Sequence, residues 1–518
     1  MSDPIQRLVI VGGGSAGWMT AAALSSVLPS NRYSITLVES EAIGTVGVGE
    51  ATLPHLRFFN QRLGISEPEF MRETRATYKL GIEFNHWGKL GDSYIHPFGE
   101  FGRPINGIGF HHYWLRLRSS VSADPIGDYS LPVVAAQAGR FAYPATDPES
   151  ILSSYSYAYQ MDSTLYAKFL RGRAESQGVT RVEGLIGEVK QDSASGNITA
   201  VKTQNGKEIE GDLFVDCSGF RGLLIEQTLN AGYENWQHWL PCDRAVAVAC
   251  ETAGTPLPYT RATADRAGWR WRIPLTHRTG NGHVYCSEFT DDETALNSLL
   301  EGLDGAPIND PNPLRFTTGR RRRMWVKNCV AIGLSAGFLE PLESTGIHLI
   351  QLGIMKLMEY LPGRPHDPTC ADEFNRLMQM EIERIRDFLV LHYTATRRDD
   401  SPFWDHCRTM RRPDSLNEKW ELFARRGHVD RYTEGLFLEP SWIAVYLGQR
   451  VIPQHYDPRV DAISLTTLGQ AMSNMTGLIK GAANSLPEHA KALESLRDEQ
   501  VQPNQGWKQS AMSLYRAT

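Results

Sequence analysis

The feature that most constrains the fold is a glycine-rich turn near the start of the chain. Leu8–Val11 is expected to form a β-strand and Trp18–Leu28 a helix, with Gly12, Gly14 and Gly17 in GxGxxG spacing between them. The first two glycines permit a tight turn and close approach of the backbone to a pyrophosphate, and the third lets the helix pack on the strand. A pyrophosphate would meet the free N–H groups and the positive end of the helix dipole. The turn therefore predicts a dinucleotide-binding site.

The segment after this helix completes a strand–helix–strand unit. A second apolar strand is expected at Ser34–Val38, and Glu39 follows it, where an acidic side chain accepts hydrogen bonds from ribose hydroxyls. Parallel strands joined by a helix are typical of a doubly wound sheet, so we expect an α/β fold with a Rossmann-like core. The turn alone does not separate FAD from NAD. Without a dinucleotide, the same residues would be only a glycine-rich turn and a surface glutamate.

Strand-like runs continue along the chain until the pattern becomes helical from His348 onward. Glu381–Asp387 is a charged segment that we expect inside a further helix. We predict a discontinuous α/β core over residues 1–347, with insertions near 76–115 and 269–274, and a mainly helical substrate-binding region over 348–518 packed on that core. More strands of the same sheet are expected at Ile198–Val201, Leu213–Val215, Ala245–Cys250 and Cys329–Ile332.

Composition argues against several classes of protein. The net charge of −6 provides no overall attraction for nucleic acid or for acidic membrane surfaces, and no apolar run approaches the roughly 20 residues of a membrane span. The seven cysteines lack metal-ligand spacing, so we expect reduced, mostly buried thiols and neither a metal site nor a disulfide framework. The polar start has no signal-peptide pattern, which favours a cytoplasmic protein with a small-molecule substrate. The oligomeric state, a homodimer included, stays open.

An aromatic motif in the middle of the chain is the most specific sign of function. Trp269, Trp271, Ile273 and Pro274 stand in the order WxWxIP. In this motif the chain resembles the flavin-dependent tryptophan halogenases, and the resemblance runs from the first strand to beyond residue 350 and more loosely to the C-terminus. It implies that these bulky side chains hold the organic substrate away from the flavin. A WxW pair alone would instead favour an aromatic core strand that ends at the proline.

A lysine within Tyr78–Ile82 matches the catalytic lysine of this family. A lone lysine is usually a solvated surface charge, because burial of an ammonium is costly. Lys79 would donate a hydrogen bond to hypohalous acid and orient its electrophilic halogen, or, with a depressed pKa, carry the halogen as a haloamine. The sequence leaves both routes open.

A later segment, GFLEPLESTGI, resembles the part of the family that contacts both flavin and substrate. Glu343 matches the catalytic glutamate, which would stabilise positive charge on the attacked ring and accept the proton lost on rearomatisation. Thr345 and Gly346 match the positions whose backbone N–H groups bind halide, Gly337 a flavin contact and Ser344 a substrate contact. Without the resemblance, an acidic residue that opens a helix is often only a partner of the helix dipole.

Weaker matches support the same fold and site. Gly47–Thr52, with Gly49 and Ala51, resembles the segment that lines the flavin, and Asp216–Gly219 resembles a strand-end turn of FAD monooxygenases. Gly333 opens another flavin-contact turn. Many flavin monooxygenases have an aspartate after that glycine, whereas Leu334 follows it here, which puts a ribityl hydrogen bond in doubt. The substrate contacts implied by an HxF pair are His96, Pro97 and Phe98, although a histidine beside a proline is equally typical of a packed loop.

Two further polar clusters are assigned no ligand. Arg320–Arg323 is a dense basic run directly before an apolar segment, and we expect an ion-paired strand entry because the chain as a whole is acidic. His111 and His112 have no partner at ligand spacing and are expected to belong to a packed aromatic loop rather than a metal site.

The resemblance implies an enzyme that uses FADH2, oxygen and chloride or bromide to make hypohalous acid and to halogenate an electron-rich aromatic ring such as an indole. The sequence shows no second GxGxxG motif and no nicotinamide domain, so a separate NAD(P)H-dependent flavin reductase should supply the FADH2. The alternatives are a single-component FAD-dependent aromatic hydroxylase, which would need neither Lys79 nor the WxWxIP motif, and a non-catalytic flavin-binding protein.

One departure from the family concerns the substrate. Members that act on free tryptophan typically carry a Tyr-Tyr pair, with a glutamate further on, to hold its carboxylate and ammonium. In a loose alignment of the C-terminal region, Ile443 and Ala444 replace the tyrosines and Arg450 replaces the glutamate. Because desolvated charges without partners cost a few kcal/mol each, this predicts indole or a simply substituted indole rather than free tryptophan.

Overall fold

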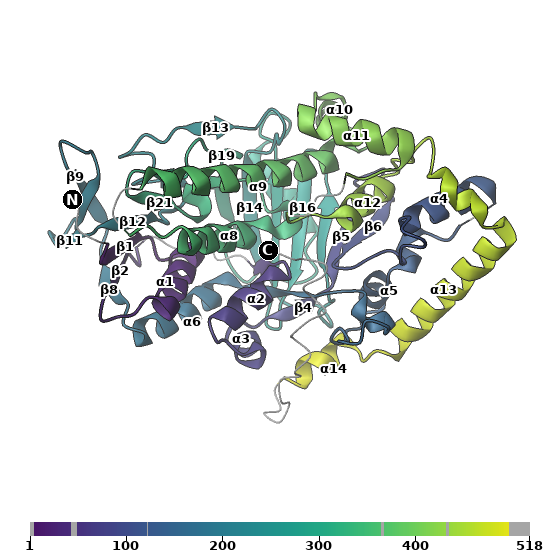
Figure 1. The fold of residues 1–518 in the computed structure, drawn as a ribbon, viewed down its shortest axis with the longest axis horizontal. Helices are drawn as coiled ribbons and strands as arrows, with labels where there is room; N and C mark the ends of the chain where they lie inside the picture. The colour runs from purple at the N-terminus through teal and green to yellow at the C-terminus, as the bar shows by residue number, and fades with distance from the viewer. Residues whose placement is uncertain (1–4, 43–48, 122, 364–366, 431–434, 497–518) are drawn as a thin grey trace.

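A parallel sheet at one end of the molecule holds the glycine-rich turn (Figure 1). The computed structural model describes residues 5–42, 49–121, 123–363, 367–430 and 435–496. Within this sheet only the edge strand β20 runs antiparallel to its neighbour. In spatial order its strands are β20 (Trp325–Val326), β21 (Cys329–Ala331), β12 (Leu213–Asp216), β1 (Arg7–Val11), β2 (Ser34–Glu39) and β8 (Thr180–Glu183).

The predicted strand–helix–strand unit is confirmed. Helix α1 (Ser15–Val27) begins directly after the turn and joins β1 to β2, which pair in parallel register. Its alanines are buried against α6 (Ser163–Ser176) and α8 (Thr345–Glu359), so a helix with small side chains fits closely on this face of the sheet. The helix and β1 together place the N-terminal end of α1 at the carboxyl ends of the strands, where ligands bind in doubly wound folds.

Two of the four further strands were assigned to the wrong sheet. Leu213–Val215 and Cys329–Ile332 do lie beside β1 as β12 and β21. Ile198–Val201 instead lies in β10 (Ile198–Thr203), which pairs antiparallel with its chain neighbours β9 (Ile186–Gln191) and β11 (Glu208–Glu210). Ala245–Cys250 lies in β14 (Arg244–Cys250) of a second large sheet. An apolar run predicts a strand but not its partners, and antiparallel neighbours need only short connections.

The second large sheet carries the tryptophan motif, and a small three-stranded sheet, β3 (Gly49–Ala51), β7 (Ala158–Asp162) and β4 (Thr77–Lys79), contacts it through β3. Strand β5 runs straight on from β4 after Leu80, so the lysine strand leads directly into the large sheet. That sheet has the order β18 (Asn312–Arg315), β14, β17 (Thr279–Tyr285), β16 (Gly268–Pro274), β15 (Thr260–Ala264), β5 (Gly81–Asn85) and β6 (Ser93–Pro97).

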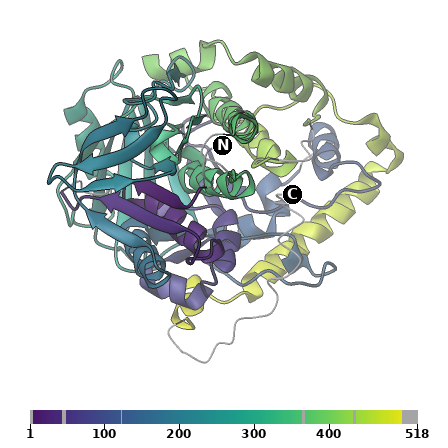
Figure 2. The ribbon, with the colours of Figure 1, turned by 60° about the vertical axis from the view of Figure 1, so that its left-hand side comes forward.

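Helices account for the regular structure described after β22, the last strand, and two of them, α8 and α9, cross the middle of the molecule (Figure 1). Of the remaining ones, the long helix α13, drawn in yellow, lies on the side away from the parallel sheet (Figure 2). The predicted helical segment Glu381–Asp387 lies inside α9. No helix among the described residues is long and apolar enough to cross a membrane. The helices from α9 on are α9 (Pro368–Thr394), α10 (Pro402–Thr409), α11 (Asp414–Arg426), α12 (Glu439–Gly448), α13 (Leu465–Ser485) and α14 (His489–Glu494).

The two polar clusters without a ligand have structural roles. His111 and His112 do not lie in a loop, as expected, but in the first turn of α4 (Phe110–Ser120), because the aromatic and leucine side chains that follow bury one side of a helix. Arg320 and Arg321 lie on β19 (Gly319–Arg321) and form ion pairs, which confirms the expected ion-paired strand. All seven cysteines are free, and all but one are buried. The described residues contain no cluster of side chains suited to a metal ion.

The other described elements complete the packing around these sheets. Their bounds are β13 (Tyr233–Asn235), β22 (Gly337–Phe338), α2 (His55–Arg62), α3 (Glu67–Glu73), α5 (Leu131–Gln137), α7 (Asp292–Glu301) and the short 3-10 turns η4 (Gly333–Ser335) and η5 (Leu342–Ser344).

Candidate active site

The glycine-rich turn has the shape that a dinucleotide requires. Gly12 has φ +108°, and a Cβ there or at Gly17 would overlap backbone atoms of neighbouring segments. A Cβ at Gly14 would meet nothing within 4 Å, so open space lies at the N-cap of α1. No side chain caps this helix and its first turn holds no acidic residue, which leaves its N–H groups available to an anion. The turn therefore fits a pyrophosphate.

Glu39 and Gly333 lie around the same turn, and Gly337 follows Gly333 closely in the chain. Glu39 ends β2 as expected, and Arg181 Nε donates to its Oε1 at 2.6 Å. Gly333 has φ +80°, and a Cβ there would lie 2.8 Å from the Cβ of Ala16 in the first turn of α1. Gly337 pairs with Arg320 in a small sheet beside it. The carboxyl end of β21 thus brings Gly333 against the dinucleotide turn, although the two segments lie far apart in the chain.

Lys79 is completely buried at the end of β4. Its Nζ donates to the backbone oxygen of Thr52 at 3.1 Å and to Ser344 Oγ at 2.9 Å, and lies 5.2 Å from the centre of the Phe98 ring. Burial lowers the pKa of Lys79 to about 7, against the opposing attraction of the Glu343 carboxylate. At neutral pH this lysine therefore populates both the ammonium and the free amine.

Glu343 is equally buried and lies between two histidines. His96 Nδ1 on β6 lies 2.9 and 2.8 Å from its two oxygens, and His392 Nε2 on α9 lies 2.9 Å from Oε1. Burial acts to raise the pKa of Glu343, but the charge of His96 and the hydrogen bonds from both histidines outweigh it and hold the pKa at about 2. The carboxylate is therefore ionised throughout the physiological pH range.

The backbone around Glu343 takes an uncommon conformation. Glu340, Glu343 and Ser344 have φ values of +73°, +63° and +60°, in the left-handed region that residues other than glycine rarely occupy. The turn directs Glu343 toward β6 and α9 and Ser344 toward Lys79. Such strain persists where the surroundings determine it, and it gathers at functional sites.

Helix α8 starts immediately after this turn, and no side chain caps its N-terminus. Thr345 is buried in its first turn, whereas Gly346 is exposed and a Cβ there would meet nothing within 4 Å. The positive end of the helix dipole and the first N–H groups are thus open to a small anion, and this fits the halide site implied for these two residues.

The tryptophan motif lies on β16 and contacts both β3, the strand of Gly49 and Ala51, and the lysine strand β4. Trp269 and Trp271 are buried on one face, with ring centroids 6.2 Å apart. Ile273 contacts the position where a Cβ of Gly49 would lie, at 3.4 Å, and Thr77 Oγ1 donates to Pro274 O at 2.7 Å. The motif therefore packs against the segment that precedes Ala51 and also against β4. Gly47 and Val48 lie outside the described residues.

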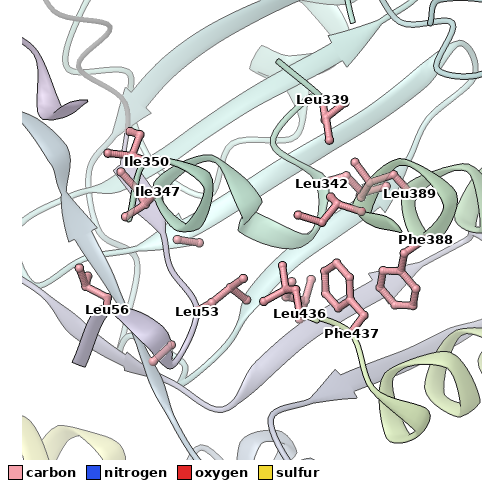
Figure 3. Close-up of a cluster of buried hydrophobic side chains, with 14 of the residues drawn as sticks. Leu53, Leu56, Leu339, Leu342, Ile347, Ile350, Phe388, Leu389, Leu436 and Phe437 are labelled. Atoms are coloured by element: carbon pink, nitrogen blue, oxygen red, sulfur yellow. The ribbon is translucent and has the colours of Figure 1, made fainter. Parts of the chain in front are cut away.

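Apolar side chains surround the lysine and the glutamate. The rings of Phe388 and Phe437 stack at 4.0 Å, and the Phe388 ring lies 5.7 Å from that of His96. His96 is not in a packed loop but on β6, which ends at the buried Pro97. Figure 3 shows these phenylalanines near Leu342 and Leu53, which adjoin the active-site residues in the chain. An aromatic substrate would find an apolar environment here.

The segment expected to differ from tryptophan-specific enzymes lies next to this site. Ile443 and Ala444 are buried on α12, which packs directly on β6, the strand of His96. Arg450 follows α12 with a half-exposed side chain, and its guanidinium pairs with Asp92 at 2.6 Å. Asp92 thus neutralises the charge at position 450, so any loss of recognition of an amino acid would depend on the two apolar residues.

One residue of the site was not predicted. His392 completes the contacts of Glu343, yet it stands alone on an otherwise apolar face of α9. In the sequence, the one sign of its role is a histidine within a run of apolar residues. A histidine that is simply packed in the core shows the same pattern. The structure also assigns Ser344 a contact with Lys79 that the resemblance had not implied.

Comparisons with known proteins agree with this geometry. The family model described as tryptophan halogenase matches residues 7–464. SttH, the tryptophan 6-halogenase of Streptomyces toxytricini, is 40% identical over 503 residues, which cover 91% of this chain and 94% of SttH. Among solved structures, a flavin-dependent halogenase from Xanthomonas campestris is 48% identical with a TM-score of 0.92, covering 95% of this chain and 98% of that one. BrvH, a flavin-dependent halogenase from a Brevundimonas species, is 46% identical with a TM-score of 0.92, covering 95% and 99%.

Matches of this extent, together with a buried lysine and glutamate and a turn that fits a dinucleotide, define a flavin-dependent halogenase. The chain belongs to the tryptophan halogenase family. Its mixed α/β architecture with a Rossmann-like sheet is the one expected from the glycine-rich turn.

Proposed function

We propose that this halogenase acts on indole or a simply substituted indole, with chloride or bromide as the halide, and that Lys79 and Glu343 perform the halogen transfer. The observation that supports these roles most is their joint burial: Lys79 Nζ bonds Ser344 Oγ, and Ser344 follows Glu343 on the same strained turn. FAD would be held by the glycine-rich turn, Glu39 and the Gly333 turn, and in reduced form it supplies the oxidising chemistry that converts halide to hypohalous acid with oxygen.

Lys79 can position the electrophilic halogen in either of two ways. As an ammonium it donates a hydrogen bond to the oxygen of hypohalous acid and polarises the oxygen–halogen bond. As an amine it takes the halogen, releases water, and passes the halogen to the ring. With a pKa of about 7, both forms exist at neutral pH. Thr52 O and Ser344 Oγ hold the nitrogen in one place for either route.

Glu343 acts on the ring rather than on the halogen. When the ring attacks the halogen, it gains a positive charge and keeps a proton that it must then lose. A carboxylate that stays ionised stabilises that charge and then accepts the ring proton, so that the electron pair of the broken C–H bond restores the aromatic ring. Its low pKa means that it carries a full negative charge at working pH. The apolar surroundings from Phe388 and Phe437 strengthen the attraction.

The substrate class follows from what surrounds His96 and Phe98. Flat aromatic side chains lie on several sides, whereas Ile443 and Ala444 offer no hydroxyl to an amino acid. The carboxylate and ammonium of free tryptophan would lose water without gaining partners there, at a few kcal/mol each. SttH is named for tryptophan, so this chain would differ from it in substrate.

We further propose that a separate NAD(P)H-dependent reductase supplies the FADH2, that the halide binds at Thr345 and Gly346, and that residues 348–518 form the substrate-binding region. The open N-terminus of α8 supports the halide assignment. The position of α9 and α12 against β6 supports the assignment of the helical region.

A competition assay tests the proposal. The enzyme, with FAD, a flavin reductase, NADH and bromide, is given equimolar indole and tryptophan, and the products are counted by mass spectrometry. Bromoindole should exceed bromotryptophan by at least about tenfold, since even one unpaired polar group costs that much. Reagent hypobromous acid on the same mixture is the control for selectivity that arises without the enzyme. Bromotryptophan as the main enzymatic product would refute the substrate assignment, and absence of any brominated product would refute the proposed reaction.

A further inference from the structure

His392 is the most buried polar neighbour of Glu343. It lies on α9 with no exposed surface, enclosed by the rings of Phe84, Trp87 and Phe388 at centroid distances of 5.0, 6.1 and 5.0 Å. Its two ring nitrogens have one partner each. Nδ1 lies 2.8 Å from the backbone oxygen of Phe388, and Nε2 lies 2.9 Å from Glu343 Oε1.

These two contacts determine how many protons the pair holds. A neutral imidazole has one N–H donor and one acceptor nitrogen. The Phe388 carbonyl only accepts, so Nδ1 has to carry a proton. Nε2 then faces a carboxylate oxygen, and two acceptors do not bond. One additional proton therefore lies between His392 and Glu343.

Other buried histidines of the chain show the contrast. His489 donates from Nδ1 to Pro256 O at 2.7 Å and accepts from Tyr78 N–H at 3.2 Å, which is the arrangement of a neutral ring. His96 contacts Glu343 through Nδ1, and its Nε2 has no partner among the described residues, so its contacts alone do not require a proton on both nitrogens. Only His392 of these three has acceptors at both nitrogens.

We propose that His392 is a positioning residue for the halogenation site: a buried imidazolium that keeps Glu343 ionised and fixes the direction of its carboxylate. This inference rests on the proposed role of Glu343. The imidazolium supplies a charge-assisted hydrogen bond to Oε1, and its rigid position in the aromatic surroundings fixes that oxygen. The carboxylate therefore does not have to rotate when the ring proton arrives. His96, Tyr94 and Lys79 are the other titratable groups that act on the pair.

The contact also explains how a carboxylate with so little solvent remains charged. An isolated buried carboxylate would take up a proton and lose its ability to accept another. With a full positive charge next to it, Glu343 stays ionised. It is then a weak base, but its negative charge can stabilise the positive charge on the ring. The chain supplies that charge from α9, a helix that follows the turn of Glu343 only after α8.

Two variants and a control test the role in turnover. His392→Leu removes the charge and the donor, whereas His392→Gln keeps a neutral donor. We expect the halogenation rate to fall by about 10²-fold in the leucine variant and less in the glutamine variant, with the KM for indole changed by no more than about twofold. Hypohalous acid should meanwhile escape into solution, where a halogen-trapping dye detects it.

The matched control is His283→Gln. His283 is also buried and has a hydrogen bond between Nδ1 and a backbone oxygen, that of Ala295, but it lies on β17 opposite Arg270, on the other face from the two motif tryptophans. This variant should keep the wild-type rate and release no additional hypohalous acid. A leucine variant with wild-type rate and no release would overturn the positioning role.

Nitrogen NMR of the histidine-labelled, full-length wild-type enzyme tests the charge without relying on any variant to fold. Both ring nitrogens of His392, assigned by their loss in His392→Gln, should be protonated near neutral pH, and Glu343→Gln should leave only one of them protonated. A wild-type ring with one protonated nitrogen would overturn the imidazolium. If the wild-type enzyme forms no halogenated product at all, the proposed function fails, whereas the NMR result for His392 still stands or falls by itself.

Discussion

Replacement of Lys79 by methionine should make the enzyme inactive and, near neutral pH, relieve a large electrostatic strain. The lysine has a pKa of about 7 in the folded chain and 10.5 as its ordinary value, because burial disfavours the charged form. Burial of the charged form therefore costs roughly 5 kcal/mol of stability below about pH 7, where the lysine is protonated in both the folded and the unfolded chain.

The number of bound protons determines whether wild-type stability rises or falls with pH. Between about pH 7 and pH 10.5 the unfolded lysine keeps its proton while the folded lysine has released it, so the unfolded chain binds more protons and wild-type stability rises with pH. The remaining loss is about 4 kcal/mol at pH 7 and about 1 kcal/mol at pH 9.5. Methionine has no such dependence. The difference in unfolding free energy between Lys79→Met and wild type should therefore shift by about 3 kcal/mol in favour of wild type over this range.

Urea denaturation followed by tryptophan fluorescence at the two pH values measures this shift. The absolute difference also contains the loss of two hydrogen bonds, to Thr52 O and Ser344 Oγ, but that contribution does not change with pH. Lys207→Met is the matched control, because Lys207 is exposed on the surface and its replacement should leave the difference constant. A Lys79→Met difference that stays constant or shifts the other way would refute the argument that burial controls this lysine.

Three other outcomes are expected. Glu343→Gln should lower the halogenation rate by about 10² to 10³-fold, measured with the reductase-coupled assay, because an amide neither balances ring charge nor accepts the proton; a rate within threefold of wild type, roughly the error of such comparisons, would contradict this role. Gly14→Val should weaken FAD binding at unchanged thermal stability, whereas Gly17→Val should lower the melting temperature, since only the second side chain would overlap protein atoms. Stopped-flow mixing of oxidised enzyme with NADH should leave the flavin oxidised unless a reductase is added, and rapid bleaching would instead favour a single-component hydroxylase.

The dinucleotide unit could be predicted from the sequence because all its signals are local. The alternation of a strand, glycines at fixed spacing and a helix lies within forty residues or so, and the structure places Gly12, Gly14, Gly17 and Glu39 around one open helix N-terminus. The partners of later strands could not be predicted in the same way. Ile198 and Ala245 start runs with the same apolar pattern as β12, yet antiparallel neighbours along the chain take them into other sheets.

The halogenation site shows a second limit of prediction from sequence. Only the resemblance to a family, not any local pattern, suggested that Lys79 and Glu343 belong to one site, and the contact of Lys79 with Ser344, 265 positions away, was not suggested at all. His392 was missed because its function depends on what faces each nitrogen. In the sequence it is one histidine in an apolar part of a helix, and the acceptors at its two nitrogens, Phe388 O and Glu343 Oε1, are visible only in the structure. Proton counts of this kind come only from three-dimensional neighbours.

The turn from Glu340 to Gly346 connects the two halves of the proposed reaction. Glu343 and Ser344, in left-handed conformations, direct one carboxylate toward the histidines and one hydroxyl toward Lys79. The next two residues open α8, the helix that packs on α1. A change in this turn would therefore move the proposed halide site and the halogen-transfer groups together. Because the contacts from β4, β6 and α9 all act on the same few residues, the strain at Glu343 is maintained from three directions, and this explains how non-glycine residues remain in that conformation.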